Sequence, residues 1–597
     1  MLKTRDQIGE AYKWDLTKIY KNIDEFNLEF EEVKKLIEDY KKYEGHTMDD
    51  AHTFYSSIVD DLKIDRKLSK LYSYASMKSD EDISNNENAE LKDRVLNLWH
   101  YASSVMYFEK PELLKVDYNV IEQYYLEEPR LKEHENNIKE MYRYKEHTLS
   151  DSSEKLLSSL SQAFGNDEEV YIYIKDSDMT FGTIQNENGE EVGLTDTNYS
   201  IYIKSNDRTV RKQAFQELYK HYKQFRNSIT KTLDGMIKQN VALARVRNYP
   251  SSFLASLYRD DMDPKVYETL VNTVHDNIEV LHEYYDLKKE VLGLDEFHLY
   301  DAYAEMVPEL DKTYPFQEGK ELVLNALKPL GETYIQDLKK AFSEKWIDIY
   351  PNKNKCGGAY TGGSYDTYPY VLLNYQDQLD DVSTLAHELG HSMHSFYTRK
   401  YQDYQYGDYP IFVAEVVSTV NELLLMKYMI QNSNSNQEKL AILNQLLELF
   451  QSTIYRAVMF AEFEKFAYDI VENNDVITAD KLCEGYYKLN QFYFGNRVVV
   501  DSEIQYEWEK VPHFFCNFYV YKYATGISAA CKIVTGILNH EGHALENYLK
   551  MLRSGSVENP LDTLRIAGVD MTDKSVYESA IHMFRETIEE FKALQYK

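Results

Sequence analysis

Apolar side chains recur at helical spacing along most of the chain, and this pattern limits the fold more than any other feature. A helix brings residues three and four positions apart onto one face. One such stripe contains Phe26, Phe30, Val33, Ile37 and Tyr40, and similar stripes follow up to the last segment. Only 12 prolines and 23 glycines are spread over the 597 residues. The sequence therefore predicts a mainly helical protein.

Two stretches break the helical pattern and predict small hairpins or sheets. The first covers residues 178–203, where an Asn-Gly pair at 188 and 189 separates short β-prone runs. The second covers residues 357–375. No low-complexity tract or long linker marks a domain boundary. We divide the chain approximately into an N-terminal helical region at 1–115, a helical and hairpin region at 116–203, and a region at 204–597 that carries the chemistry below.

The acidic composition limits the partners of the chain. Its formal net charge is -32, from 99 acidic and 67 basic side chains, and nucleic acids and anionic membranes repel such a surface. The first residues, MLKTRDQIGE, do not resemble an export signal, and no later window has the apolar length of a membrane span. We therefore expect a soluble protein of the cytoplasm.

The sequence HELGH at residues 387–391 is the strongest local indication of chemistry. The residues around it have helical spacing, so the motif lies on a predicted helix. On that helix His387 and His391 are one turn apart and can bind the same ion. Glu388 projects at an adjacent angle, where it can act as general base on a water molecule. Because this short pattern also occurs by chance, it needs independent support.

A second predicted helix provides that support. Glu415 stands in the apolar run IFVAEVVSTVNELLLMKY, which begins at residue 411. A carboxylate buried in such surroundings is costly unless it is paired or binds a metal. Two imidazoles and one carboxylate would leave a fourth position open for water, as in catalytic zinc sites. The pattern indicates one zinc ion held by His387, His391 and Glu415, with an exposed or salt-bridged Glu415 as the alternative.

Three further residues can support the metal ligands. Ser418 and Glu422 lie on the same predicted helical face as Glu415, where they can hold a zinc-bound imidazole through its other nitrogen. His394 follows His391 by three positions and can play a similar part. An ordinary surface or core histidine is the equal alternative for His394.

Hydrolysis by an activated water also needs donors that stabilise the oxyanion and protonate the leaving group. The segment VPHFFCNFYVYKYATG at 511–526 offers His513 on a predicted helix that ends at Gly526. Three tyrosines follow on the same segment: Tyr519, Tyr521 and Tyr523. Aromatic core packing is the alternative for each of them.

Seven segments spread along nearly the whole chain carry a combined signal. They are WDLTKIY at 14, RKQAFQELYKHY at 211, GGAYTGGSYDTYPYVLLNY at 357, TLAHELGHSMHS at 384, FVAEVVSTVNE at 412, PHFFCNFYVYKYATG at 512 and LRSGSVENPLDTLRIAGVDM at 552. Together they resemble the oligoendopeptidase F branch of the thimet oligopeptidase family of zinc peptidases. They lie in the family's order, which makes them far more specific than HELGH alone.

The resemblance implies a two-lobed, almost wholly helical ellipsoid with zinc deep in a channel, which restricts substrates to short unstructured peptides. It implies that Glu415 is the third ligand and that His513 is the family's substrate-binding histidine. It does not select among the three tyrosines, because the thimet branch spaces its functional tyrosines differently. The edge strand that binds the peptide backbone would contain Gly358, Ala359 and Tyr360.

The resulting prediction is a zinc endopeptidase in which Glu388 takes a proton from water and returns it to the leaving nitrogen. A carboxydipeptidase is one alternative, and it would need a residue that anchors a free C-terminal carboxylate. A helical peptide-binding protein without catalysis is another. We expect a monomer or a small homo-oligomer.

Overall fold

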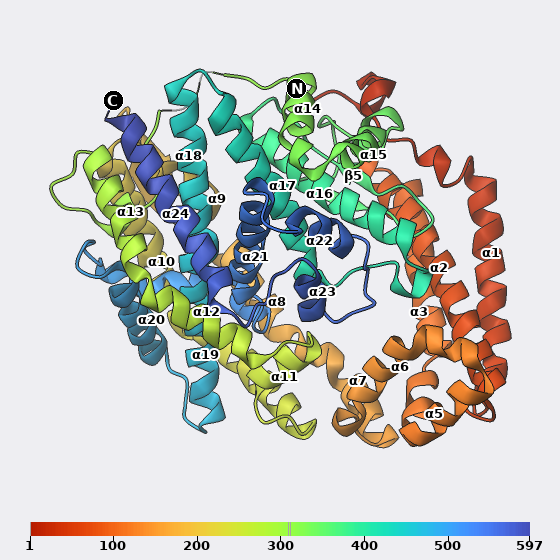
Figure 1. The fold of residues 1–597 in the computed structure, drawn as a ribbon. Coiled ribbons are helices and arrows are strands. Elements are labelled where there is room, and N and C mark those ends of the chain that lie inside the picture. Colours follow the sequence, from red (N-terminus) through yellow and green to blue (C-terminus); the bar gives the residue numbers. More distant parts are fainter. Residues whose placement is uncertain (1, 309, 311, 597) are drawn as a thin grey trace. The chain divides into compact units, whose positions relative to one another are not determined.

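The computed structural model describes residues 2–308, 310 and 312–596. These residues are mostly helical and include five short strands, which confirms the predicted fold class (Figure 1). Contacts divide the chain into two compact units of three segments each. Unit 1 consists of Met1–Glu146, Lys312–Tyr428 and Ile533–Val569, and unit 2 of His147–Asp311, Met429–Lys532 and Asp570–Lys597. The three continuous regions inferred from the sequence stay a prediction.

Unit 1 combines helices with a small sheet. Two helices, α17 (Ile411–Asn432) and α21 (Tyr521–Leu538), contain residues of both units. The other helices of unit 1 are α1 (Ile23–Tyr40), α2 (Ala51–Glu81), α3 (Asn86–Val105), α4 (Glu109–Lys115), α5 (Tyr118–Glu127), α6 (Glu135–Arg143), α14 (Phe316–Ala326), α15 (Glu332–Ser343), α16 (Leu379–Tyr401), α22 (Ala544–Met551) and α23 (Pro560–Ile566).

Unit 2 is built around α10 (Arg208–Val246), a helix of 39 residues that contacts several of the others. The remaining helices of unit 2 are α7 (Asp151–Phe164), α8 (Asn166–Tyr173), α9 (Asp196–Ile203), α11 (Ser252–Arg259), α12 (Pro264–Asp276), α13 (Ile278–Val291), α18 (Asn436–Phe450), α19 (Ala457–Glu472), α20 (Ala479–Phe494) and α24 (Lys574–Gln595). No helix in the described residues combines the length and apolar character that crossing a membrane requires.

The stretch at 178–203 contains the predicted hairpin, but it is shorter than expected. Strands β1 (Thr183–Gln185) and β2 (Glu191–Gly193) pair antiparallel. The residues from Asp196 to Ile203 form helix α9 instead. Thr195 explains the difference, since its hydroxyl and the Asn198 side chain form a capping box that starts a helix there.

The stretch at 357–375 forms most of the sheet in unit 1. Strand β4 (Tyr360–Gly362) pairs antiparallel with β5 (Tyr370–Leu372), and β3 (Ile347–Asp348) pairs with β5 in parallel. The strand order is β3-β5-β4, so β4 lies at an edge. Side chains of β5 join the buried core that α1, α2 and α3 form.

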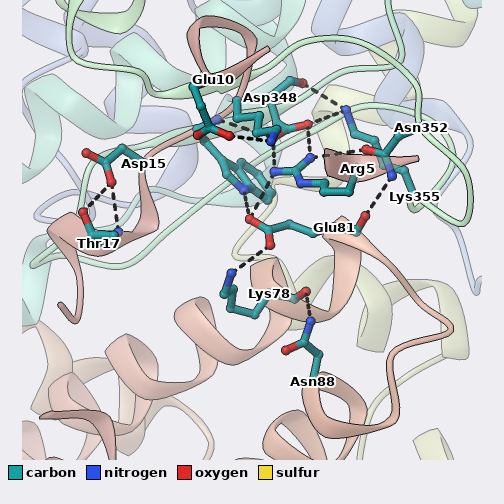
Figure 2. A network of polar contacts seen from close by, with 12 residues as sticks. Arg5, Glu10, Asp15, Thr17, Lys78, Glu81, Asn88, Asp348, Asn352 and Lys355 are labelled. Atoms are coloured by element: carbon teal, nitrogen blue, oxygen red, sulfur yellow. Dashed lines mark hydrogen bonds and ion pairs between the residues drawn. The ribbon is translucent and has the colours of Figure 1, made fainter. Parts of the chain in front are cut away.

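A network of buried charges fixes β3 to the N-terminal segment (Figure 2). The guanidinium of Arg5 donates to both carboxylate oxygens of Asp348, at 2.8 and 2.5 Å. Lys355 lies 2.7 Å from the same carboxylate. Glu81, at the end of α2, accepts from Arg5 and from the indole of Trp14. A buried carboxylate with two cationic partners is costly to disrupt, because the partners would lose their counter-charge.

Further contacts of Lys355 and of α2 hold the strands of this sheet. The ammonium group of Lys355 also donates to the carbonyl oxygens of Tyr350 and Leu373. The hydroxyl of Tyr360 donates to Asp80 of α2 at 2.7 Å. Strand β4 is therefore held by α2 as well as by its neighbour β5.

Candidate metal centre and edge strand

Helix α16 carries the HELGH sequence, as predicted. His387 and His391 lie at partly exposed positions on it. The apolar residues that define its helical spacing are buried, namely Val382, Leu385, Ala386, Leu389 and Met393. Core packing thus fixes the orientation of the helix and of its two histidines.

Gly390 allows α17 to pack closely against α16. A Cβ atom at this position would stand 2.7 Å from the Cα atom of Ser418, which is closer than real Cβ contacts come. Across the same contact, the side-chain amide of Asn421 donates to the carbonyl oxygen of Ala386 at 3.0 Å. This close approach brings Glu415 within reach of the two histidines.

The three expected ligands converge. The Nε2 atoms of His387 and His391 lie 3.2 Å apart, and Oε2 of Glu415 lies 3.6 and 3.8 Å from them. Two ligand atoms on one tetrahedral zinc ion stand about 3.3 Å apart, given bonds of about 2.0 Å. The separations and the donor set fit a single zinc ion with a fourth position left for water.

The environment of Glu415 differs from the expectation. Its side chain is 48% exposed, so the prediction of a buried carboxylate is wrong. The apolar character of α17 belongs to its neighbours Val416 and Val417, which are fully buried. Proximity to the imidazoles, and not burial, marks Glu415 as a candidate ligand.

Glu422 and Ser418 contact different members of the ligand set. A carboxylate oxygen of Glu422 makes a short contact with Nδ1 of His387, which is the geometry expected of a residue that orients a metal-binding imidazole. Ser418 instead lies with its hydroxyl 3.3 Å from Oε2 of Glu415. The prediction that Ser418 holds an imidazole is therefore wrong, because its hydroxyl meets the carboxylate ligand.

His394 lies in the core beneath this group. It is fully buried, and its ring stacks on Tyr409 with centroids 3.6 Å apart. Burial and the nearby His391 lower the pKa of His394 to about 3, so its ring is neutral. The Tyr409 hydroxyl lies 3.4 Å from the carbonyl oxygen of His391. His394 can therefore support the candidate ligand His391 only by packing against Tyr409, and not by a hydrogen bond to its imidazole.

The electrostatic environment of the two histidines is asymmetric. Burial acts to lower the pKa of His387, but the hydrogen bond to Glu422 raises it overall. Burial and the adjacent His387 lower the pKa of His391 to about 4. Metal ions bind the neutral imidazole, so a neutral His391 suits this task.

Glu388 is buried and held by a residue of β4. It is 7% exposed, and the hydroxyl oxygen of Thr361 lies 2.8 Å from both its Oε2 atom and its backbone carbonyl oxygen. Burial raises the pKa of Glu388, while the hydrogen bond from Thr361 opposes this shift. A raised pKa brings a carboxylate closer to the value that general-base catalysis at neutral pH favours.

The residues expected to bind the peptide backbone lie at the start of β4. Gly358 has a φ of 76°, and its carbonyl oxygen accepts from Asn374 at 2.8 Å. Ala359 follows, and Tyr360 is the first residue of the strand. Within the described residues β4 pairs only with β5, so its other edge has no strand partner. Such an edge can add a peptide as a further strand.

The segment around His513 does not form the predicted helix over 511–526. Pro512–Phe515 form a short 3-10 helix, and α21 begins only at Tyr521 and continues through Gly526. Asn517 and Phe518 separate the two, because their φ values of 43° and 59° are incompatible with a right-handed helix.

Buried contacts stabilise this turn in unit 2. The backbone N–H of Phe518 donates to Glu464 of α19 at 2.6 Å. The carbonyl oxygen of Asn517 accepts from Ser256 of α11 at 3.1 Å. The strained backbone is therefore held by two helices that lie far from it in the sequence.

The turn brings His513 together with two of the three candidate tyrosines. Nε2 of His513 lies 3.2 Å from the hydroxyl of Tyr523, and the rings of Tyr519 and Tyr523 are 5.5 Å apart. Burial lowers the pKa of His513. Tyr521 is only 1% exposed, so its side chain cannot contact a substrate.

Two residues of the metal centre have no counterpart in the sequence reasoning. Thr361 lies within the GGAYTGG segment that indicates the edge strand, yet nothing in its spacing links it to Glu388. Asn421 lies one position before Glu422, and its contact with α16 depends on the packing of two helices.

Comparisons with known proteins identify relatives of the chain. The model of peptidase family M3 matches residues 201–583, and that of oligopeptidase F matches residues 112–181. The chain is 39% identical to oligopeptidase PepF of Bacillus subtilis, over all of this chain and 89% of that protein. It is 37% identical to group B oligopeptidase PepB of Streptococcus agalactiae, over all of this chain and 99% of that protein.

A solved structure extends the likeness to the fold. The crystal structure of oligoendopeptidase-F from Enterococcus faecium has a TM-score of 0.74 and 33% identity, and the match covers 96% of this chain and 99% of that one. A family match over more than half of the chain, together with full-length relatives, shows that the chain belongs to peptidase family M3, in its oligoendopeptidase F group.

Proposed function

We propose that the chain is a zinc-dependent oligoendopeptidase that hydrolyses internal bonds of short unstructured peptides. The observation that carries the proposal is the convergence of His387, His391 and Glu415 beside the buried carboxylate of Glu388. A zinc ion bound there would polarise a peptide carbonyl and lower the pKa of water. The names of the full-length relatives support the same activity.

The side chains of the site divide the remaining work. Glu388 accepts a proton from the attacking water and later gives it to the leaving nitrogen. Glu422 holds the ring of His387 in one orientation. The free edge of β4, which begins at Tyr360, and the preceding residues Gly358 and Ala359 bind the peptide backbone, which favours extended substrates over folded ones.

His513 and the exposed phenols are proposed to stabilise the oxyanion. Tyr523 is 39% exposed and lies beside His513, whereas Tyr521 is buried, so the role falls to Tyr519 or Tyr523. Neutral donors of this kind stabilise developing negative charge when they are preorganised. The contact between His513 and Tyr523 provides such preorganisation.

Replacement of Glu388 by Gln tests the proposed chemistry. We expect the variant to keep its bound zinc and to lose turnover by about 100- to 10,000-fold, because the amide cannot accept the proton. Zinc is measured by elemental analysis, and cleavage with an internally quenched peptide. Glu546→Gln, at a side chain that is 77% exposed, is the matched control. Substantial cleavage by Glu388→Gln would contradict the assigned role.

The choice between endopeptidase and carboxydipeptidase needs a separate measurement. A peptide with an amidated C-terminus should be cleaved at internal bonds by the proposed enzyme. A carboxydipeptidase needs the free carboxylate and should fail on this substrate. Mass spectrometry of the products distinguishes the two, with the unblocked peptide as control.

A further inference from the structure

A cavity lies in unit 1, outside the candidate metal centre. Its volume is about 390 Å³, and helix α2, the residues after β4 and the residues around the end of α16 line it. None of the metal-centre residues described above lines this cavity. Sites for small molecules in proteins begin at about 300 Å³, so the space suffices for a ligand of that class. We call it the Arg399 cavity, after the cationic side chain in its wall.

Arg399 has donor capacity that the protein leaves unused. Its Nη1 atom is buried and has no hydrogen-bond partner in the described part of the chain. Its Nη2 atom makes one long contact, of 3.4 Å, with the carbonyl oxygen of Gly363. Burial lowers the pKa of Arg399, and the nearby Tyr409, Asp408 and Asp366 only partly offset this shift. A buried guanidinium of this kind gains stability from a carboxylate partner.

A serine next to this contact is also unsatisfied. Ser364 is 6% exposed, lines the cavity, and its hydroxyl has no partner among the described residues. Gly363 precedes it with a φ of 104°, and a Cβ atom there would approach the carbonyl oxygen of Tyr368 to 2.4 Å. The turn therefore requires glycine. Two unsatisfied donors, Nη1 of Arg399 and the hydroxyl of Ser364, lie in the wall of the cavity, and both are covered, so a side-chain rotation has to turn each of them toward a ligand.

Acidic side chains also line the Arg399 cavity. Asp65 accepts a hydrogen bond from Tyr404 at 2.6 Å, and Asp408 accepts from the backbone N–H of Tyr409 at 2.9 Å. Two carboxylates beside one guanidinium disfavour a simple anion such as phosphate, because it would be repelled. They favour a molecule that carries an ammonium group as well as a carboxylate.

The rest of the wall is suited to an organic side chain. Tyr72, Trp99 and Tyr365 line the cavity with aromatic surface. Aromatic rings bury apolar groups and also attract cations over their faces. The wall therefore combines a carboxylate site, an ammonium site and an apolar surface.

We propose that the Arg399 cavity binds a zwitterionic amino acid or dipeptide. The carboxylate of the ligand bonds to Arg399 and Ser364, and its ammonium group lies near Asp65 and Asp408. Such molecules are the smallest products of peptide breakdown, so the site would sense or retain products. Arg399 follows His391 by eight residues on α16, about 12 Å along the helix. A ligand here therefore contacts the helix that carries the metal ligands.

Calorimetric titration of the full chain with the dipeptide Ala-Phe tests the proposal. We expect binding to the wild-type protein that weakens by at least about tenfold when the carboxylate is amidated, because hydrogen bonds to the charged groups are lost. N-acetylation should also weaken binding, since it removes the ammonium charge. Binding of acetate or phosphate with the same affinity as Ala-Phe would overturn the zwitterion assignment.

Variants locate the binding. Arg399→Gln should weaken Ala-Phe binding by at least about tenfold, while Lys400→Gln, a loss of the adjacent positive charge on the same helix, should leave it unchanged. Ser364→Ala should weaken Ala-Phe binding by a smaller factor. This variant tests the site if Arg399→Gln does not fold. Asp408→Asn should weaken Ala-Phe but not N-acetyl-Ala-Phe. Equal affinities of the Arg399 and Lys400 variants, or no binding to wild type, would refute the proposal.

The binding measurement is independent of peptide cleavage. A wild-type protein that binds Ala-Phe through Arg399 but cleaves no peptide would contradict the proposed oligoendopeptidase and leave the cavity assignment standing. A wild-type protein that cleaves peptides but does not bind the dipeptide would contradict the cavity assignment and leave the proposed oligoendopeptidase standing.

Discussion

At the scale of single residues, the candidate metal centre depends on two contacts that involve none of the three candidate ligands. Gly390 lets α17 approach α16 so closely that Glu415 meets the histidines. Thr361 reaches from the edge strand to the carboxylate of Glu388. The second contact joins the proposed peptide-binding strand to the proposed base, so it should control where the base stands relative to the substrate.

Thr361→Val removes this contact with little change in volume. We expect kcat to fall by about 10- to 100-fold and KM to change little, because a hydrogen bond to a charged group is worth about 1.5–3 kcal/mol. Thr361→Ser keeps the hydroxyl and should restore most of the rate. Steady-state kinetics with one quenched peptide measure both constants. A serine variant as slow as the valine variant would show that the methyl group, and not the hydroxyl, matters.

At the scale of elements, the Arg5, Asp348 and Lys355 contacts hold together three segments that lie far apart in the sequence. Asp348 is 1% exposed and lies on β3, next to the strand that supports β4. Burial acts to raise the pKa of Asp348, but hydrogen bonds from Arg5 and the charge of Lys355 lower it overall. The lowered pKa means that the ionised form is the one that stabilises the fold.

Asp348→Asn should therefore destabilise the protein in a pH-dependent way. At pH 7 we expect a loss of about 3 kcal/mol in the free energy of unfolding, since the buried Lys355 loses its ion-pair partner and Arg5 keeps only Glu81. The contribution of Asp348 is present above its unfolded pKa of about 3.9 and is lost as the pH falls through the lower folded value. The difference between wild type and variant should accordingly shrink in acid.

Urea unfolding at neutral and acidic pH measures this difference. Asp117→Asn, at a side chain that is 89% exposed, is the matched control and should change stability little at either pH. A difference between wild type and Asp348→Asn that stays constant down to acid pH would contradict the ionic account.

Local patterns predict the elements well where nothing distant opposes them. The spacing of apolar residues places α16, and the geometry of a helix then brings His387 and His391 together. The same reasoning fails at 511–526, because the break at Asn517 and Phe518 is stabilised by Glu464, some fifty positions away. It also misplaces Glu415, since α17 carries apolar residues on nearly all of its sides and its pattern therefore does not tell which positions are exposed.

At the scale of the whole molecule, the dominant property is the net charge of -32. The charge attracts cationic peptides at long range and repels acidic ones. Salt limits this range, because the Debye length is about 30 Å at 0.01 M ionic strength and about 8 Å at 0.15 M.

Peptides of equal length and different charge should therefore respond differently to salt. We expect kcat/KM for a lysine-rich peptide to fall as ionic strength rises from about 0.01 to 0.15 M, and that for a glutamate-rich peptide to rise. A neutral peptide of the same length is the control. Parallel salt dependence for all three would show that the net charge does not steer substrates.

The division of both units into three separate segments has a consequence for biosynthesis. Unit 1 draws its last segment from Ile533–Val569, and unit 2 ends with Asp570–Lys597. The ribosome must therefore synthesise almost the entire chain before either unit can complete its hydrophobic core. Until then the apolar surfaces of α1, α2 and α3 that pack against β5 stay exposed, because β5 is translated some 260 residues after α3 ends. Nascent chains of this length with exposed apolar surface are prone to aggregate, so slow or stalled translation should make the protein depend on chaperones.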